Sequence, residues 1–179
     1  MDYISEIKNY YQVLIDTIGK LNLEEINDAM NAIDKVYQNE ATIYICGNGG
    51  SAAMASHLSV DLTKAAGVRA INFNEADLLT CFANDFGYEH WVSKALDYYS
   101  DSGDLVILIS SSGKSPNMIN GAKTAKEKGL DVVTFSGFDA QNPLRNLGIL
   151  NFWANSTSYN FVEMAHHVWL LAVVDRLIK

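Results

Sequence analysis

The chain has 179 residues, of which 49% are hydrophobic and 19% charged, which predicts one globular domain with a sizeable core rather than disorder. Its formal net charge of −8 supplies no basic field for nucleic-acid phosphates, so we expect no direct nucleic-acid binding. The start of the chain is too charged for a signal peptide, and no apolar run is long enough for a membrane span. Two cysteines without a Cys-x-x-Cys spacing suit a reducing compartment, and we expect a cytoplasmic protein.

Two amphipathic helices are predicted ahead of the first strand, at about 3–20 and 23–38, from apolar residues at intervals of three and four. A small sheet does not need two leading helices to cover one edge. We therefore expect 1–38 to be a helical pair that packs against another subunit of a homo-oligomer. The alternative is that the pair simply caps its own domain.

Residues 39–179 alternate between short apolar, β-branched runs and helical patterns. The predicted strands are 42–46, 68–73, 104–109, 132–135 and 149–153. The helices between and after them include 76–84, one ending near 99, 116–128 and 159–177, with one short helical turn near Asn142-Pro143. This alternation predicts a parallel sheet with right-handed crossovers in a three-layer α/β sandwich. No linker or repeat interrupts the chain, so 1–179 is expected to be a single domain.

A glycine-rich turn, Gly47–Ser51, follows the first predicted strand. Its glycines allow a sharp turn and a close approach to a ligand. We expect Ser51 to cap the next helix, whose free N–H groups and dipole favour an anion. The turn also fits the loose dinucleotide fingerprint, but Glu75 is the only candidate for a ribose-binding acid, and we expect no nucleotide cofactor.

A serine loop, Ser110–Ser115, follows the most hydrophobic predicted strand. It resembles the tail of a nucleotide-binding P-loop, but Leu108 stands where that signature requires glycine, so the P-loop interpretation fails. Pro116 suits the first position of the following helix. Hydroxyls beside a helix N-terminus can bind a phosphate monoester without a metal. In a parallel sheet both loops reach the same edge, where ligands bind.

Titratable side chains are grouped on two predicted helices. His57 and Asp61 lie one turn apart, and their spacing would suit either a metal site or an ordinary hydrogen bond. Glu163, His166 and His167 lie in an otherwise apolar stretch of the last helix. Such groups are costly to bury unless they are paired or liganded, which favours a site, although either histidine could also be a satisfied core residue.

Three segments together resemble the sugar isomerase (SIS) domain family, and within it the phosphoheptose isomerases: 47–53 with His57, 83–88, and 109–115. The resemblance covers nearly the whole chain. It implies a flavodoxin-like five-stranded parallel sheet and a homotetramer with active sites between subunits. It also implies aldose–ketose isomerisation of sedoheptulose 7-phosphate to a heptose 7-phosphate, a sugar phosphate used for surface polysaccharide precursors.

The resemblance also assigns roles by position. It implies substrate binding by Asn48, Gly49, Gly50, Ser51, Asp85, Ser110, Ser111, Ser112 and Ser115. Asp61 stands where the family has its base, and we expect Glu163 and either His166 or His167 to assist it. The resemblance implies a zinc ion as the cofactor. Its expected ligands in this chain are His57, Asp61, Glu163 and His167. The serine loop is then expected to hold phosphate, while the glycine turn positions the sugar.

The chain departs from the family pattern at three positions. Asp61 replaces a glutamate, Glu163 a glutamine, and Leu171 a histidine. Leucine can neither bind zinc nor act as an acid, so His166 or His167 would have to supply the imidazole, or another ligand set would hold the metal. The alternative is a non-catalytic SIS protein that binds a phosphosugar or another protein, as a replication-initiator-associating member of the family does.

Overall fold

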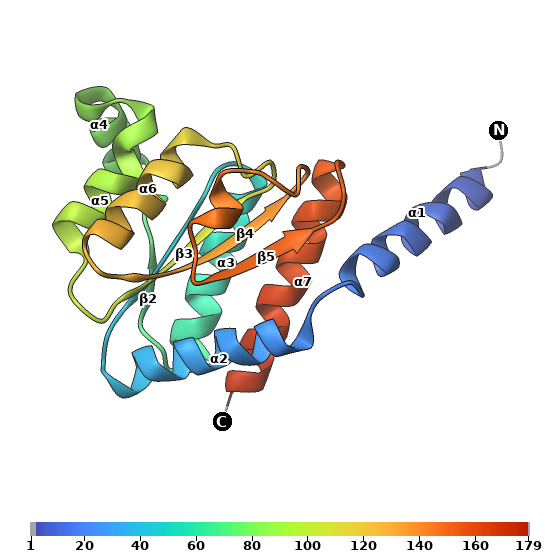
Figure 1. The fold of residues 1–179 in the computed structure, drawn as a ribbon, viewed down its shortest axis with the longest axis horizontal. Helices are drawn as coiled ribbons and strands as arrows, with labels where there is room; N and C mark the ends of the chain where they lie inside the picture. Colours follow the sequence, from blue (N-terminus) through green and yellow to red (C-terminus); the bar gives the residue numbers. More distant parts are fainter. Residues whose placement is uncertain (1–2, 179) are drawn as a thin grey trace.

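The computed structural model describes residues 3–178 and contains a five-stranded parallel sheet in the order β2-β1-β3-β4-β5 (Figure 1). The strands are β1 (Ile43–Gly47), β2 (Ala70–Asn72), β3 (Leu105–Ser110), β4 (Asp131–Gly137) and β5 (Leu150–Ala154). This is the flavodoxin-like strand order. The order of successive strands across the sheet reverses between β1 and β3, which is the topological switch point. The predicted fold class is therefore confirmed.

Helices cover both faces of the sheet (Figure 1). One face carries α2 (Leu23–Gln38), α3 (Gly50–Lys64) and α7 (Tyr159–Leu177), and the other carries α4 (Ala76–Phe86), α5 (Trp91–Tyr99) and α6 (Pro116–Glu127). The central strand β3 explains this arrangement. Its Ile107 and Ile109 join the core under the first group, while Val106 and Leu108 join the core under the second. A strand buried on both faces needs such a continuous apolar run.

The two leading helices behave differently. Ile33 and Val36 of α2 are buried in the core, so α2 caps its own domain. In contrast, α1 (Tyr3–Ile18) extends away from the sheet (Figure 1). Its C-terminal end is tied to α7, where the Trp169 indole N–H donates to the Ile18 carbonyl at 3.0 Å. The alternative, that the helix caps its own domain, therefore holds for α2, and an oligomer contact through α1 stays a prediction.

Two local predictions need correction. The helix predicted at 76–84 extends farther, because α4 continues to Phe86 and is capped at its C-terminus by Gly87, whose φ of +89° suits glycine. The second strand is shorter than the predicted 68–73. The short helical turn expected near Asn142-Pro143 is present at Leu144–Asn146. Within the described residues, no helix is long and apolar enough to cross a membrane.

The sheet register brings the two predicted loops together. β1 and β3 pair in parallel, and Gly47 at the end of β1 lies opposite Ile109 of β3. The glycine turn and the serine loop therefore leave the sheet side by side at its C-terminal edge, between strands whose crossover helices lie on opposite faces.

Candidate functional site

The glycine turn starts α3 without a side-chain cap. Gly49, with φ +54° and ψ −121°, is the N-cap, and Ser51 lies buried inside the first turn. The prediction that Ser51 caps the helix was therefore wrong. At Gly47 an added Cβ would stand 2.6 Å from the Ser51 carbonyl carbon, so the tight turn requires glycine there as well.

The serine loop is held by its own hydroxyls. The Ser110 and Ser115 Oγ atoms lie 3.0 Å apart, and the Gly113 N–H donates to the Ser110 carbonyl at 2.9 Å. Ser115 is the N-cap of α6, with Pro116 in the first turn as predicted. Because the Ser115 hydroxyl bonds to Ser110, it is not spent on capping, and the first N–H groups of α6 are left for an anion.

A pocket of about 210 Å³ lies between these loops. The sequence-predicted residues that line it are Asn48, Ser51, Ser110, Ser111, Ser112, Ser115 and Glu163. Tyr159 of α7 adds an aromatic wall that sequence reasoning missed. Hydroxyls, one amide and a helix N-terminus thus converge on one small space beside the Glu163 carboxylate, and the hydroxyls with the helix N-terminus are suited to a phosphate group.

Asn48 is locked in place by a second asparagine. Its side-chain amide donates to Asn117 Oδ1 at 3.0 Å and accepts from Asn117 Nδ2 at 2.8 Å, and the Tyr88 hydroxyl donates to Asn48 Oδ1 at 3.0 Å. Asn48 and Tyr88 also line a neighbouring pocket of about 290 Å³ beside Gly49. Asn117 and Tyr88 were not predicted as site residues, and only their places after Pro116 and in segment 83–88 pointed to them.

Glu163 brings a carboxylate to the start of α3. Its Oε1 accepts a hydrogen bond from the Ser111 hydroxyl at 3.3 Å. A Cβ added at Gly50 would overlap this carboxylate, so glycine is needed for the two to approach. The positive end of the α3 dipole favours a negative group at this point.

Three further residues, from α3 and α7, form an array of close polar contacts. The His57 Nε2 lies 3.1 Å from Asp61 Oδ2, and the His57 Nδ1 lies 2.9 Å from His167 Nε2. The Asp61 carboxylate beside His57 Nε2 favours the tautomer that has its proton on Nε2, and in that tautomer the His167 Nε2–H donates to His57 Nδ1. Partial burial, and then the nearby His57, lower the pKa of His167. A neutral His167 can therefore accept a proton at its remaining nitrogen.

Comparison with known proteins agrees with these features. The family model described as "SIS domain" matches residues 2–137. The phosphoheptose isomerase of Glaesserella parasuis is 36% identical over 140 residues, which cover 75% of this chain and 73% of that protein. The enzyme of the same name from Haemophilus ducreyi is 32% identical over 147 residues, covering 76% of each chain. The solved phosphoheptose isomerase of Neisseria gonorrhoeae superposes with a TM-score of 0.87 at 26% identity over 98% of both chains.

This chain belongs to the SIS domain family. The matched region includes the glycine turn, the serine loop and α3, and it ends at Gly137. Helix α7, which carries Glu163 and His167, lies beyond it. The family match therefore does not extend to the part of the site that α7 contributes.

The zinc ligand set expected from the SIS resemblance does not fit these side chains. His57 stands between Asp61 and His167 and uses one ring nitrogen toward each. Because the two nitrogens of an imidazole point away from each other, one ion cannot take all three residues as placed. Glu163 is tied to Ser111 instead. Among residues 3–178, no group of three or more His, Cys, Asp or Glu side chains could hold a metal ion.

His166 does not belong to the site. It is buried in the core against Phe135, and its Nε2–H donates to the Ser136 carbonyl at 2.9 Å. Burial lowers its pKa to about 4, with the Ser136 hydrogen bond opposing the shift. The expectation that His166 assists catalysis is corrected accordingly, because the imidazole that reaches His57 and Asp61 is that of His167.

Asp85 is also outside the two pockets. It lies exposed on α4, where its Oδ1 accepts from the Asn84 side-chain amide at 2.9 Å. In the described part of the chain it is not among the residues that line either pocket. Its expected contact with the sugar stays a prediction.

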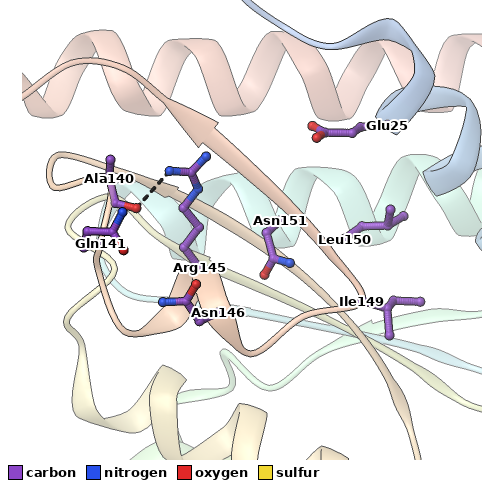
Figure 2. Close-up of a pocket in the computed structure, with 8 residues that line it drawn as sticks. All are labelled: Glu25, Ala140, Gln141, Arg145, Asn146, Ile149, Leu150 and Asn151. Carbon is purple, nitrogen blue, oxygen red and sulfur yellow. Dashed lines mark hydrogen bonds between the residues drawn. The ribbon is translucent and has the colours of Figure 1, made fainter.

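A larger pocket, of about 460 Å³, lies away from the predicted site beside the edge strand β5 (Figure 2). Glu25 enters it from α2, and Arg145 enters it from the loop before β5. The Arg145 guanidinium donates to the Ala140 carbonyl at 2.8 Å and lies 4.6 Å from the Trp153 ring centroid. No residue assigned to the site from the sequence lines this pocket.

The buried His166 predicts a pH dependence of stability. Its folded pKa, about 4, lies below its ordinary value of 6.5, so between these pH values the unfolded chain binds a proton that the folded chain does not. Stability should therefore fall as pH decreases from 6.5 to 4, by up to about 3 kcal/mol from this group. Urea unfolding of the wild type and of His166→Gln at pH 7.5 and 5 would measure it. An identical pH dependence in both proteins would contradict the assignment.

Proposed function

We propose that this chain is an aldose–ketose isomerase of the phosphoheptose type, which interconverts sedoheptulose 7-phosphate and a heptose 7-phosphate. Relatives named phosphoheptose isomerase that span most of the chain support the activity. The observation that carries the proposal is that the hydroxyl-lined pocket and the Asp61–His57–His167 array lie along one helix, α3.

The serine loop would hold the substrate phosphate. The α3 N-terminus already has the Glu163 carboxylate beside it, whereas the α6 N-terminus opens onto the serine hydroxyls. A second anion would be repelled near Glu163 and attracted by the N–H groups of α6. Asn48 and the glycine turn would then contact the sugar hydroxyls next to the phosphate.

The residues that would carry out proton transfer lie farther along α3. His57 is seven residues beyond Gly50, about 10 Å along the helix axis. An extended sugar phosphate held by the serine loop and directed along α3 would place its reacting carbons toward this array.

The reaction would use the side chains of the array. Asp61 would remove the proton from the carbon beside the carbonyl and return it to the neighbouring carbon. The carbonyl oxygen gains a proton and the adjacent hydroxyl loses one in the same exchange, and the His57–His167 pair would move that proton. General acid–base groups placed in this way contribute about 10²–10⁴-fold to a rate. Glu163, at the phosphate pocket, would assist by fixing Ser111.

Activity can be tested directly with purified protein and sedoheptulose 7-phosphate. We expect aldose formation by the wild type, and a kcat lower by about 100-fold or more in Asp61→Asn and His167→Ala, because each change removes a proton-transfer partner. His90→Ala is the matched control, since His90 is an exposed histidine outside both pockets and should leave turnover unchanged. Absence of turnover by the wild type, with or without added zinc, would contradict the proposed activity.

We further propose that this isomerisation proceeds without a zinc ion held by the His57, Asp61, Glu163 and His167 set. These side chains bond to one another or to Ser111 as placed, and Leu171 offers no ligand atom. We expect substoichiometric zinc by mass spectrometry of the purified protein, and unchanged turnover after chelation. Stoichiometric zinc, with activity lost on chelation and restored by zinc, would contradict this expectation.

A second candidate is a non-catalytic SIS protein that binds a phosphosugar. Leu171 stands where the resemblance places a histidine. This substitution favours the non-catalytic alternative, because an apolar side chain cannot donate or accept a proton. Binding of sedoheptulose 7-phosphate in a thermal-shift assay, without turnover, would support this alternative. Absence of binding as well would favour a protein-interaction role.

We also propose that the protein is a cytoplasmic homotetramer that supplies a precursor for surface polysaccharide. The support for assembly is α1, where Ile7 is 55% and Ile15 61% exposed on a helix that extends from the domain (Figure 1). Such an apolar face is typical of an interaction surface.

Assembly can be tested on the α1 face. We expect the Ile7→Asp/Ile15→Asp variant to dissociate into smaller species by light scattering, because charged side chains would be buried in the contact. The circular dichroism spectrum should be unchanged, because neither residue belongs to the domain core. Asn9→Asp, on the same helix, is the control and should remain assembled. A monomeric wild type would refute the proposal.

A further inference from the structure

A buried asparagine lies directly behind the serine loop. Asn142 belongs to the segment between β4 and β5 and has no exposed surface. A fully buried amide is costly unless its polar atoms are hydrogen-bonded, so its partners show what it holds in place.

The Asn142 amide group faces acceptors. Its Nδ2 lies 2.8 Å from the Asp139 carbonyl, 3.1 Å from Ser136 Oγ and 3.3 Å from the Gly137 carbonyl. Its Oδ1 accepts from the Arg145 backbone N–H at 3.0 Å. Both ends of the side chain are therefore fixed, one at the end of β4 and the other at the short helical turn that starts at Leu144.

The same side chain supports the middle of the serine loop. Gly113 has φ +65°, and a Cβ added there would overlap the Asn142 side-chain oxygen. The Gly113 carbonyl also accepts from the Leu144 N–H at 3.1 Å. Gly113 thus rests against Asn142 with no room for a side chain, which sets how far the loop can move back from the pocket.

We propose that Asn142 is a positioning residue for phosphate binding, acting through Gly113 on the serine loop. The inference rests on the proposed function only in that the serine loop must bind phosphate. Asn142 itself does not line the phosphate pocket. Its effect is to hold the hydroxyls and the α6 N-terminus at the separation that a phosphate group requires, since ligand affinity depends on such preorganisation.

The chemistry of the contact requires an amide rather than a carboxylate. Nδ2 faces three oxygen atoms, to which it donates, and an aspartate at this position would direct a second oxygen toward them. It would also add a negative charge behind the phosphate pocket. Asn142→Asp should therefore weaken phosphate binding more than Asn142→Ala does.

The test compares phosphate affinity with stability. Calorimetric titration with inorganic phosphate and with sedoheptulose 7-phosphate would be run on the full chain, together with KM, kcat and Tm. We expect Asn142→Ala to raise Kd and KM about tenfold while kcat changes less than twofold, because the array along α3 is untouched. Asn146→Ala is the matched control, since Asn146 is exposed on the same segment and lines the other pocket (Figure 2).

A double-mutant cycle separates positioning from general loosening. Gly113→Ala should also weaken phosphate binding, because the new Cβ meets Asn142. In the Asn142→Ala background the overlap with the Asn142 Oδ1 and Cγ atoms is removed, while the 2.8 Å approach to its Cβ and the strain of a positive φ remain, so the second substitution should cost less than it does alone. If Asn142→Ala does not fold, Asn142→Ser, which keeps one donor, takes its place in the cycle.

The possible outcomes distinguish this inference from the proposed function. A lowered Tm with unchanged Kd and KM in Asn142→Ala, or strict additivity in the cycle, would overturn the positioning role. Phosphate binding by the wild type without turnover would reject the isomerase while leaving the binding test of Asn142 intact. No phosphate binding by the wild type would overturn the positioning role, since the loop would then have no phosphate to position.

Discussion

The parallel pairing of β1 with β3 is the constraint on which the site depends. Because both strands end at the same edge of the sheet, the glycine turn and the serine loop must leave it together. Their crossover helices lie on opposite faces, which opens a space between the loops. A pocket lined by hydroxyls from one loop and by Asn48 and Ser51 from the other follows from this topology.

The two helix N-termini at this edge of the sheet have different polar neighbours. α3 has the Glu163 carboxylate of its own chain beside it, and α6 has the serine hydroxyls. The arrangement leaves one favourable position for an external anion, and it gives that anion an orientation, with the rest of the ligand directed along α3. Under the proposed function, the departure from the family pattern at Glu163 would therefore affect where phosphate is held, as well as which atoms could bind a metal.

The array of Asp61, His57 and His167 differs from a metal centre in geometry as well as in composition. A central imidazole with a polar partner at each nitrogen is suited to proton transfer, but it cannot direct both nitrogens at one ion. His166 shows the other fate of a histidine on α7. One residue earlier on the helix, its ring turns into the core and is kept neutral by burial.

The sequence by itself determined the fold class, the helix and strand order and the two loops, because periodicity, β-branched runs and the Gly and Pro signals are local properties of the chain. It also grouped His57 with Asp61, since four-residue spacing on a helix brings side chains together. Only the tertiary structure decided between His166 and His167, because helix spacing cannot say which face meets the core. It likewise decided the Gly49 cap, the Asn48–Asn117 pair and the support of Gly113 by Asn142. The last two contacts join residues far apart in the chain, and their geometry is set by the packing of the layers.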